Sequence, residues 1–279
     1  MSPRLRATTA ILLLTWTIHG FVPRSNAKRC HPRIPTTYSA TSTVLCGGYD
    51  ATIGADPNTP LQIYCSKEKS PDDLCTFLCL AELDLKYEVM SELPTPVPDW
   101  FLRIHPDGTT PALRNPVDES LNNDIVSNTP SETEKVNQYL CKVYQATNKE
   151  ATTCPLLPAD DEGIATMKAI QHQIGTTVLP ACRLFLENKD PSQEVSYQAA
   201  AEDALRSLFE SQTSPPFLTG SDLTLVDIHL FTRLKFIFLK LNTSKQYILP
   251  SNTMGGMKSW HDACASRPAF QAVLSNKEE

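Results

Sequence analysis

The sequence lacks the features that mark a metal site or a disulfide scaffold. Its nine cysteines are an odd number, none is spaced as CxxC, and none pairs with histidine at a spacing typical of zinc sites. Glycine is scarce, with ten residues against 22 prolines. We therefore expect most cysteines to be buried apolar side chains in a reducing compartment, and we expect no bound metal.

Acidic residues are missing from the first 49 positions, which carry six Lys and Arg. Subtracting these six from the 25 basic residues of the chain leaves 19 against 31 acidic residues, so residues 50–279 carry a net charge of −12. A body this acidic argues against nucleic acid or an anionic membrane surface as the main partner.

The N-terminal segment has the composition of a targeting leader. Arg4 and Arg6 precede the apolar run ILLLTWTI at 11–18, which is too short to span a bilayer. Residues 21–55 are rich in basic residues, Ser and Thr, as in organelle transit peptides. The join at Gly20-Phe21 resembles the bipartite leaders of proteins imported into complex algal plastids. We expect a signal peptide at 1–20, a disordered transit-like segment at 21–55 and a plastid location, with secretion through the ER as the alternative.

Residues 56–150 have the pattern of a small α/β domain. Strands are predicted at 61–64, 86–90, 112–113 and 124–126. The sequence SPDD at 70–73 predicts a helix start, with Ser70 as N-cap, proline at the first helical position and two acids at the positive end of the helix dipole. A helical turn at 98–104 and a helix from about 131 complete the order β-α-β-α-β-β-α, in which the strand headed by Pro111 is central.

Residues 151–163 form a linker rich in Pro and Asp, and residues 164–279 are predicted to be an all-α domain. Helices are expected at 164–186 (which Pro180 could interrupt), 195–210, 224–241 and 257–265, with a further turn after Pro268. Thr224 and Asp227 have the spacing of a capping box before a very apolar segment. A buried helix end needs internal partners for its amides, so we predict a folding role for this box.

The stretch PDWFLRIHPDGTTPAL at 98–113 joins an apolar helical turn to a strand. Gly108 allows a turn with positive φ. Pro111 cannot donate to a sheet ladder and is expected at a strand start or edge. A proline at such a junction is also the usual place for a cis peptide bond that turns backbone groups toward a ligand. The alternative is a surface turn that leads into a strand.

Four segments together resemble the glutathione transferase superfamily. PDWFLRIHPDG..PAL is similar to P-E-W-F-L-x-I-S-P-E-G-x-V-P-V-V of the dehydroascorbate reductases. ETEKVNQYL at 132–140, FLTGSDLTLVDIHLFTRL at 217–234 and SRPAFQAVL at 266–274 resemble further family segments. The resemblance covers roughly residues 60–275 and points to the dehydroascorbate reductase, omega and chloride-intracellular-channel branch. It implies a thioredoxin-like N-terminal domain and an all-α C-terminal domain.

The resemblance also implies contacts with glutathione. Thr110 would pair its backbone N–H and C=O with the cysteinyl main chain of glutathione, next to a cis Pro111. Glu132 and Thr133, at a helix N-terminus, would bind the γ-glutamyl end, where free N–H groups and a hydroxyl suit its carboxylate and a carboxylate suits its ammonium. The alternative for Glu132 and Thr133 is helix capping alone.

The position that matches the catalytic cysteine of the nearest relatives is Ser70. A serine cannot perform thiol–disulfide exchange, but it can donate a hydrogen bond to the thiolate of bound glutathione, as in serine-type transferases. Asp72 and Asp73 stand beside it, and like charge disfavours a thiolate. An arginine and a lysine found in relatives are replaced by Cys75 and Val97. The alternative role of Ser70 is that of an N-cap only.

Cys65, five residues before Ser70, is the second candidate nucleophile, because a folded-back loop would bring it to the site. Cys75 and Cys79 are four residues apart on the predicted helix and are expected to pack in the core. The histidines offer no further candidate. His105 lies in the turn, and no partner pattern for a triad or a metal surrounds His172, His229 and His261.

We expect a glutathione transferase-like protein that binds glutathione and a small electrophile or oxidised substrate, as a monomer or homodimer. Its chemistry would be conjugation, peroxide reduction or dehydroascorbate-type redox chemistry. Three alternatives are a non-catalytic binding or interaction protein of the same fold, a dehydroascorbate reductase using another cysteine, and a channel-like membrane inserter. Acids in the first helix, including Glu82 and Asp84, disfavour the last.

Overall fold

The computed structural model describes residues 56–118, 121, 124–128, 134–148, 150–151, 153–211, 216–249 and 255–275. The expected signal and transit segments lie outside these residues, and so do Glu132 and Thr133. The first part of the chain contains β1 (Leu61–Ser66), α1 (Pro71–Glu82), β2 (Tyr87–Leu93), α2 (Asp99–Ile104), β3 (Ala112–Arg114), β4 (Val126–Ser127) and α3 (Lys135–Thr147). This is the predicted order β-α-β-α-β-β-α.

The four strands form one mixed sheet in the order β2-β1-β3-β4. Strand β1 runs parallel to β2 and antiparallel to β3, and β3 runs antiparallel to β4. The strand headed by Pro111 is therefore interior, as predicted. The fourth strand lies slightly later than expected, at Val126–Ser127.

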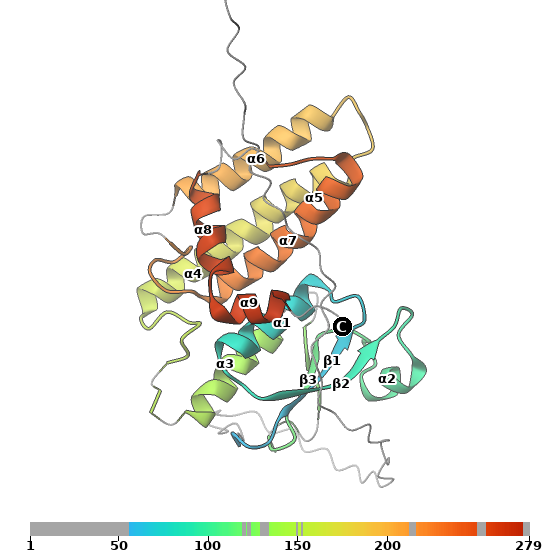
Figure 1. Ribbon diagram of the computed structural model, residues 1–279, viewed down its shortest axis with the longest axis vertical. Coiled ribbons are helices and arrows are strands. Elements are labelled where there is room, and N and C mark those ends of the chain that lie inside the picture. The colour runs from blue at the N-terminus through green and yellow to red at the C-terminus, as the bar shows by residue number, and fades with distance from the viewer. Residues whose placement is uncertain are drawn as a thin grey trace, which may run out of the picture.

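Alternate residues of β1 serve the two faces of the sheet, because side chains alternate along a strand. Ile63 and Cys65 belong to the core that includes α1 and α3. Tyr64 points to the other face and packs on Phe101 of α2, with ring centroids 5.2 Å apart. The sheet is thus covered by α1 and α3 on one face and by α2 on the other (Figure 1).

The second part is built from helices. It contains α4 (Asp161–Gln173), a π-helical turn (Ile174–Val178), α5 (Leu179–Glu187), α6 (Glu194–Glu210), α7 (Leu225–Lys245), α8 (Gly255–Ala265) and α9 (Pro268–Ser275). Pro180 does not end the first helical segment. A proline has no N–H to donate to the preceding turn, and the helix widens into the π turn just before it.

The N-terminus of α7 is closed by the predicted capping box. The Asp227 carboxylate is fully buried and accepts hydrogen bonds from the Thr224 amide at 2.9 Å, the Leu218 amide at 2.8 Å and Trp260 Nε1 at 2.9 Å. Burial raises the pKa of Asp227, against the effect of these hydrogen bonds. The box ties α7 to α8 and to the preceding turn, so the predicted folding role is confirmed.

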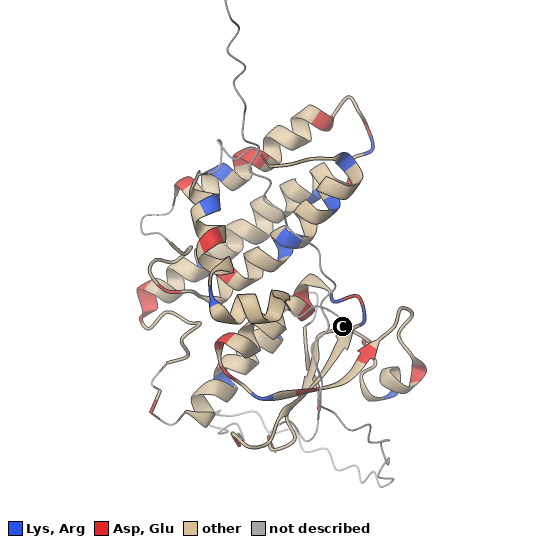
Figure 2. Cartoon of the chain, in the orientation of Figure 1, with Lys and Arg blue, Asp and Glu red and all other residues tan. Residues whose placement is uncertain are grey.

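The two parts meet where α1 lies against α7 and α9 (Figure 1). Arg267, before α9, donates two hydrogen bonds to Glu82 at the end of α1, at 2.7 and 2.6 Å. At the other end of α1, Arg233 of α7 donates to Asp72 at 2.5 Å. Charged residues of both signs are spread over both parts of the chain (Figure 2). Among the described helices, none is long and apolar enough to cross a membrane.

Candidate functional site

The candidate site lies where β1 ends and β3 begins. Tyr64 of β1 is paired with Ala112 of β3 in an antiparallel register. Ser66 lies two residues beyond Tyr64 and Thr110 two residues before Ala112, so both lie at the end of the sheet where the loop to Ser70 begins. The fold therefore brings two candidates that are 40 positions apart, Thr110 and Ser70, to the same edge of the sheet.

The loop before β3 presents the Thr110–Pro111 step with the expected geometry. The peptide bond between these residues is cis, as predicted, and a second cis bond that the sequence did not lead us to expect joins Thr95 and Pro96. Gly108 has a φ of 61°, in the region where glycine is favoured. Thr109 Oγ1 lies 3.0 Å from His105 Nε2 and donates to the Asn128 carbonyl at 3.3 Å, which fixes the loop between α2 and β4.

Ser70 is the N-cap of α1, as predicted, and its hydroxyl is shared with Asp73. Ser70 Oγ accepts a hydrogen bond from the Asp73 amide at 3.1 Å and donates one to Asp73 Oδ2 at 2.8 Å. The Asp73 carboxylate also accepts from the Ser70 amide at 2.9 Å, which completes a capping box. Ser70 itself is half-buried, whereas Asp73 is fully buried.

Asp73 is the centre of this polar network. Its side chain is fully buried, and Oδ2 also accepts from the amide and the hydroxyl of Ser66. The Ser66 hydroxyl in turn accepts from the Ser70 amide at 3.0 Å. Burial raises the pKa of Asp73, while the hydrogen bonds from Ser66 and Ser70 act in the opposite direction. The carboxylate is therefore buried, and the partners of its Oδ2 are Ser66 and Ser70.

Asp72 has a different environment from Asp73. Its carboxylate is paired with Arg233 of α7, and the Arg233 side chain is only 11% exposed. The sequence suggested that both acids would repel a thiolate at Ser70. This argument does not hold for Asp72, because the guanidinium balances its charge.

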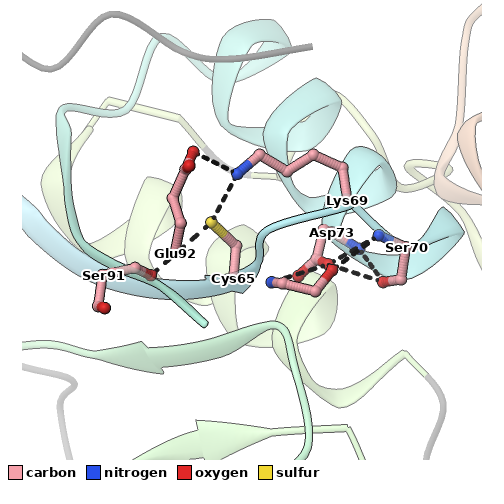
Figure 3. A network of polar contacts seen from close by, with 7 residues as sticks. Cys65, Lys69, Ser70, Asp73, Ser91 and Glu92 are labelled. Carbon is pink, nitrogen blue, oxygen red and sulfur yellow. Dashed lines mark hydrogen bonds and ion pairs between the residues drawn. The ribbon is translucent and has the colours of Figure 1, made fainter. Parts of the chain in front are cut away.

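Cys65 is part of a separate network on the other side of the same loop (Figure 3). Lys69 Nζ lies 3.2 Å from Cys65 Sγ and donates to Glu92 Oε1 at 2.6 Å. Lys69 has a positive φ of 47° and is 4% exposed. Burial raises the pKa of Cys65 to about 11, although Lys69 opposes this. The loop therefore holds the Cys65 thiol in the interior, covered by Lys69, and not at the face where Ser70 is accessible.

Two further cysteines and the histidine His229 are buried in the structure. Cys75 and Cys79 are buried in the core, as predicted. His229, for which the sequence offered no partner, lies with its Nδ1 2.5 Å from Glu134 Oε1, just before α3. Burial lowers the pKa of His229, against the effect of Glu134, so we assign it a packing role between the two parts. In the described residues, no group of three or more His, Cys, Asp and Glu is placed to bind a metal ion.

Sequence reasoning missed four participants in these networks. Ser66 is a polar residue at a strand end, and Lys69 stands next to the predicted N-cap, so both had a weak local signal. Glu92 and Arg233 had none, because they reach the loop from β2 and α7, at sequence separations of 23 and 161 residues.

No protein-family model matches this sequence, and no curated protein matches it with significance. Several solved structures match the fold of this chain. Glutathione transferase Omega 3C from Trametes versicolor matches with a TM-score of 0.63 at 18% identity, over 79% of this chain and 87% of that one. The glutathione transferase URE2P8 from Phanerochaete chrysosporium, solved with oxidised glutathione, has a TM-score of 0.56 at 20% identity, over 78% and 95% of the two chains.

A third match is Ure2p in complex with S-hexylglutathione, with a TM-score of 0.59 at 16% identity, over 78% of this chain and the whole of that one. These likenesses show the fold: a thioredoxin-like domain followed by a helical domain, as in glutathione transferases. The predicted fold class is confirmed.

Proposed function

We propose that this protein binds glutathione across the Thr110–Pro111 step and uses the glutathione thiol at Ser70. The observation that carries the proposal is the placement of Ser70 and Thr110 at one edge of the sheet, in a fold whose solved examples include complexes with oxidised glutathione and S-hexylglutathione. The main-chain N–H and C=O of Thr110 would pair with the cysteinyl unit of glutathione, beside cis Pro111. Glu132 and Thr133 would hold the γ-glutamyl end.

The residue at position 70 favours conjugation or peroxide reduction over a dehydroascorbate reductase reaction. A hydroxyl has no sulfur for disulfide exchange, so the reacting sulfur must belong to glutathione. Cys65 is a poor substitute, because it is buried beside Lys69 and its pKa is raised to about 11. We place the second substrate, a small electrophile or peroxide, on the side of the helical domain.

The first prediction concerns Ser70. The full chain should bind glutathione below millimolar concentration in isothermal titration calorimetry. Ser70→Ala should lower the rate of conjugation at least about tenfold, the loss expected for one hydrogen bond to a reacting group. Ser70→Cys should introduce dehydroascorbate reductase activity, in which the new thiol forms a mixed disulfide with glutathione and a second glutathione releases it by disulfide exchange. Absence of binding up to millimolar glutathione would refute the proposal, and an unchanged rate in Ser70→Ala would move the chemistry away from this residue.

A second candidate function is that of a binding protein of this fold without catalysis. The observation that favours it is that the only hydroxyl proton of Ser70 is already donated to Asp73. Such a protein would bind glutathione and show no turnover with any electrophile or peroxide. The same calorimetric and kinetic measurements separate the two functions.

A further inference from the structure

The hydrogen bonds of Ser70 leave it one way to meet a ligand. A serine hydroxyl has one proton and two lone pairs. The proton is donated to Asp73 Oδ2 at 2.8 Å, and one lone pair accepts the Asp73 amide at 3.1 Å. With Asp73 ionised, only the second lone pair is available. Ser70 therefore receives glutathione as a thiol, whose S–H can donate to it, and cannot donate to a thiolate.

Asp73 is placed to take up a proton through this hydroxyl. Its carboxylate is fully buried, and Oδ1 has no hydrogen-bond partner among the described residues. An unpartnered buried carboxylate oxygen is costly to keep ionised, and protonation relieves part of that cost. The raised pKa of Asp73, which burial causes, agrees with this view of its geometry.

We propose that Asp73 is the proton acceptor for the glutathione thiol, reached through the Ser70 hydroxyl. As the sulfur attacks, its proton passes to Ser70 Oγ while the Ser70 proton passes to Asp73 Oδ2. The electron pair of the S–H bond forms the new bond to the electrophilic carbon, and the leaving group departs with its own electron pair. Asp73 later returns the proton to water. This proposal rests on the proposed function, and it makes Asp73 a positioning residue that acts through Ser70.

The charges around Asp73 allow this step. From β1, the Cys65 thiol faces it and is neutral at physiological pH. From the loop, the Lys69 ammonium is paired with Glu92 of β2. On α1 itself, Asp72 is neutralised by Arg233 of α7. Lys69 and Asp72 are thus each paired with a group of opposite charge, so neither presents an unbalanced charge to Asp73.

The proposal fixes the pH dependence of the reaction. In the wild type, the rate on the acid side follows the ionisation of Asp73, because the thiol need not ionise beforehand. In Asp73→Asn, the amide oxygen can still accept from Ser70 but cannot take its proton. Attack would then need a glutathione already ionised, and a thiol has a pKa of about 8.5. The acid limb of the profile should move to higher pH.

The experiment measures kcat/KM for conjugation of glutathione to 1-chloro-2,4-dinitrobenzene between pH 5 and 9, using the full chain. Asp73→Asn should be at least about tenfold slower than wild type at pH 6 and approach it near pH 9, with glutathione affinity changed less than about threefold. Asp72→Asn is the matched control. It removes the neighbouring acid, which does not contact Ser70, and should leave the acid limb in place.

The outcomes separate this proposal from the proposed function. If the wild type does not bind glutathione, both are refuted. If the wild type binds glutathione without turnover, the proton transfer through Ser70 to Asp73 (the relay) is refuted while glutathione binding stands. The same holds if the acid limb of the kcat/KM profile of Asp73→Asn lies at the same pH as that of the wild type. Should Asp73→Asn fail to fold, the wild type still decides. The relay predicts a normal solvent isotope effect with a curved proton inventory, because two protons move together, and a linear inventory would overturn it.

Discussion

Lys69 holds the loop between β1 and α1 in place through its backbone conformation and its buried ammonium group. Its backbone has a positive φ of 47°, and its ammonium lies between Glu92 Oε1 at 2.6 Å and Cys65 Sγ at 3.2 Å. Burial alone would lower the pKa of Lys69, but hydrogen bonds to Glu92 and Cys65 outweigh it and raise the pKa. Lys69 therefore fixes the loop through its contacts with Glu92 and Cys65, while the next residue, Ser70, stays half-buried.

The residue-scale prediction concerns alkaline pH. Lys69 and Cys65 both have a raised pKa in the folded state, with Cys65 at about 11 against an ordinary value of 9.0. Their contribution to stability is therefore complete below the unfolded pKa values and is lost as pH rises through the folded ones. Cys65 alone should account for a fall of about 2–3 kcal/mol in the free energy of unfolding between pH 9 and 11.

Urea unfolding at a series of pH values measures this fall. Cys65→Ala removes the titrating thiol and should flatten the curve between pH 9 and 11. Ile63→Val, a change in a buried side chain of the same strand that does not titrate, is the comparison for loss of core volume. Equal alkaline slopes in Cys65→Ala and the wild type would contradict the prediction.

Helices α1 and α7 both begin with a capping box, but the two boxes differ in how exposed they are. Both α1 and α7 have a hydroxyl N-cap with an aspartate three residues later. Thr224 is 3% exposed and Asp227 holds the Trp260 indole, so this box is closed by the fold. Ser70 is half-buried and faces the edge that also carries Thr110. Access decides which box can meet a ligand.

The element-scale prediction follows from the closed box of α7. Asp227→Ala should lower the free energy of unfolding by about 3–5 kcal/mol, because it leaves several buried donors unpaired, among them the Leu218 amide and Trp260 Nε1. Thr224→Ala should cost only about 1 kcal/mol, as for an ordinary N-cap. Denaturant unfolding followed by tryptophan fluorescence measures both. A cost below that of Thr224→Ala would show that the network around Asp227 is not structural.

At the scale of the whole molecule, two ion pairs join the sheet domain to the helices at opposite ends of α1. The pair of Arg267 with Glu82 is bidentate, and the Glu82 side chain is 6% exposed. Arg233 with Asp72 holds the end that carries Ser70. Since α1 also packs on α7 and α9, its position depends on both parts of the chain.

The corresponding prediction is that Arg267→Met destabilises the protein by about 2–4 kcal/mol, because Glu82 is left as a buried charge without its partner. The double variant Glu82→Gln/Arg267→Met should recover most of this loss, since it removes the charge as well. Calorimetric unfolding of the single and double variants measures the coupling. If the double variant is no more stable than Arg267→Met, the pair is not the cause.

Part of this fold could be predicted from the sequence because its signals are local. The β-α-β-α-β-β-α order, the N-caps at Ser70 and Thr224, and the cis bond at Pro111 each follow from a few adjacent residues, and the structure confirms them. The role of Glu132 and Thr133, the plastid leader and the reaction itself stay predictions. The effect of Pro180 was harder to read, because whether a helix breaks or widens depends on what packs around it.

The sequence by itself determined the order of the helices and strands, the serine at the position that matches a catalytic cysteine, and the Thr110–Pro111 bond before the third strand. The hydrogen bond that commits the Ser70 proton to Asp73 is likewise local, because the two residues are three positions apart. Only the tertiary structure decided the surroundings of this pair. The charge of Asp72 is balanced by an arginine 161 residues away, and Glu92 of β2 holds the Lys69 ammonium that covers the Cys65 thiol. Helix capping acts within one turn of chain, whereas charge balance and burial depend on segments that meet only when the chain has folded.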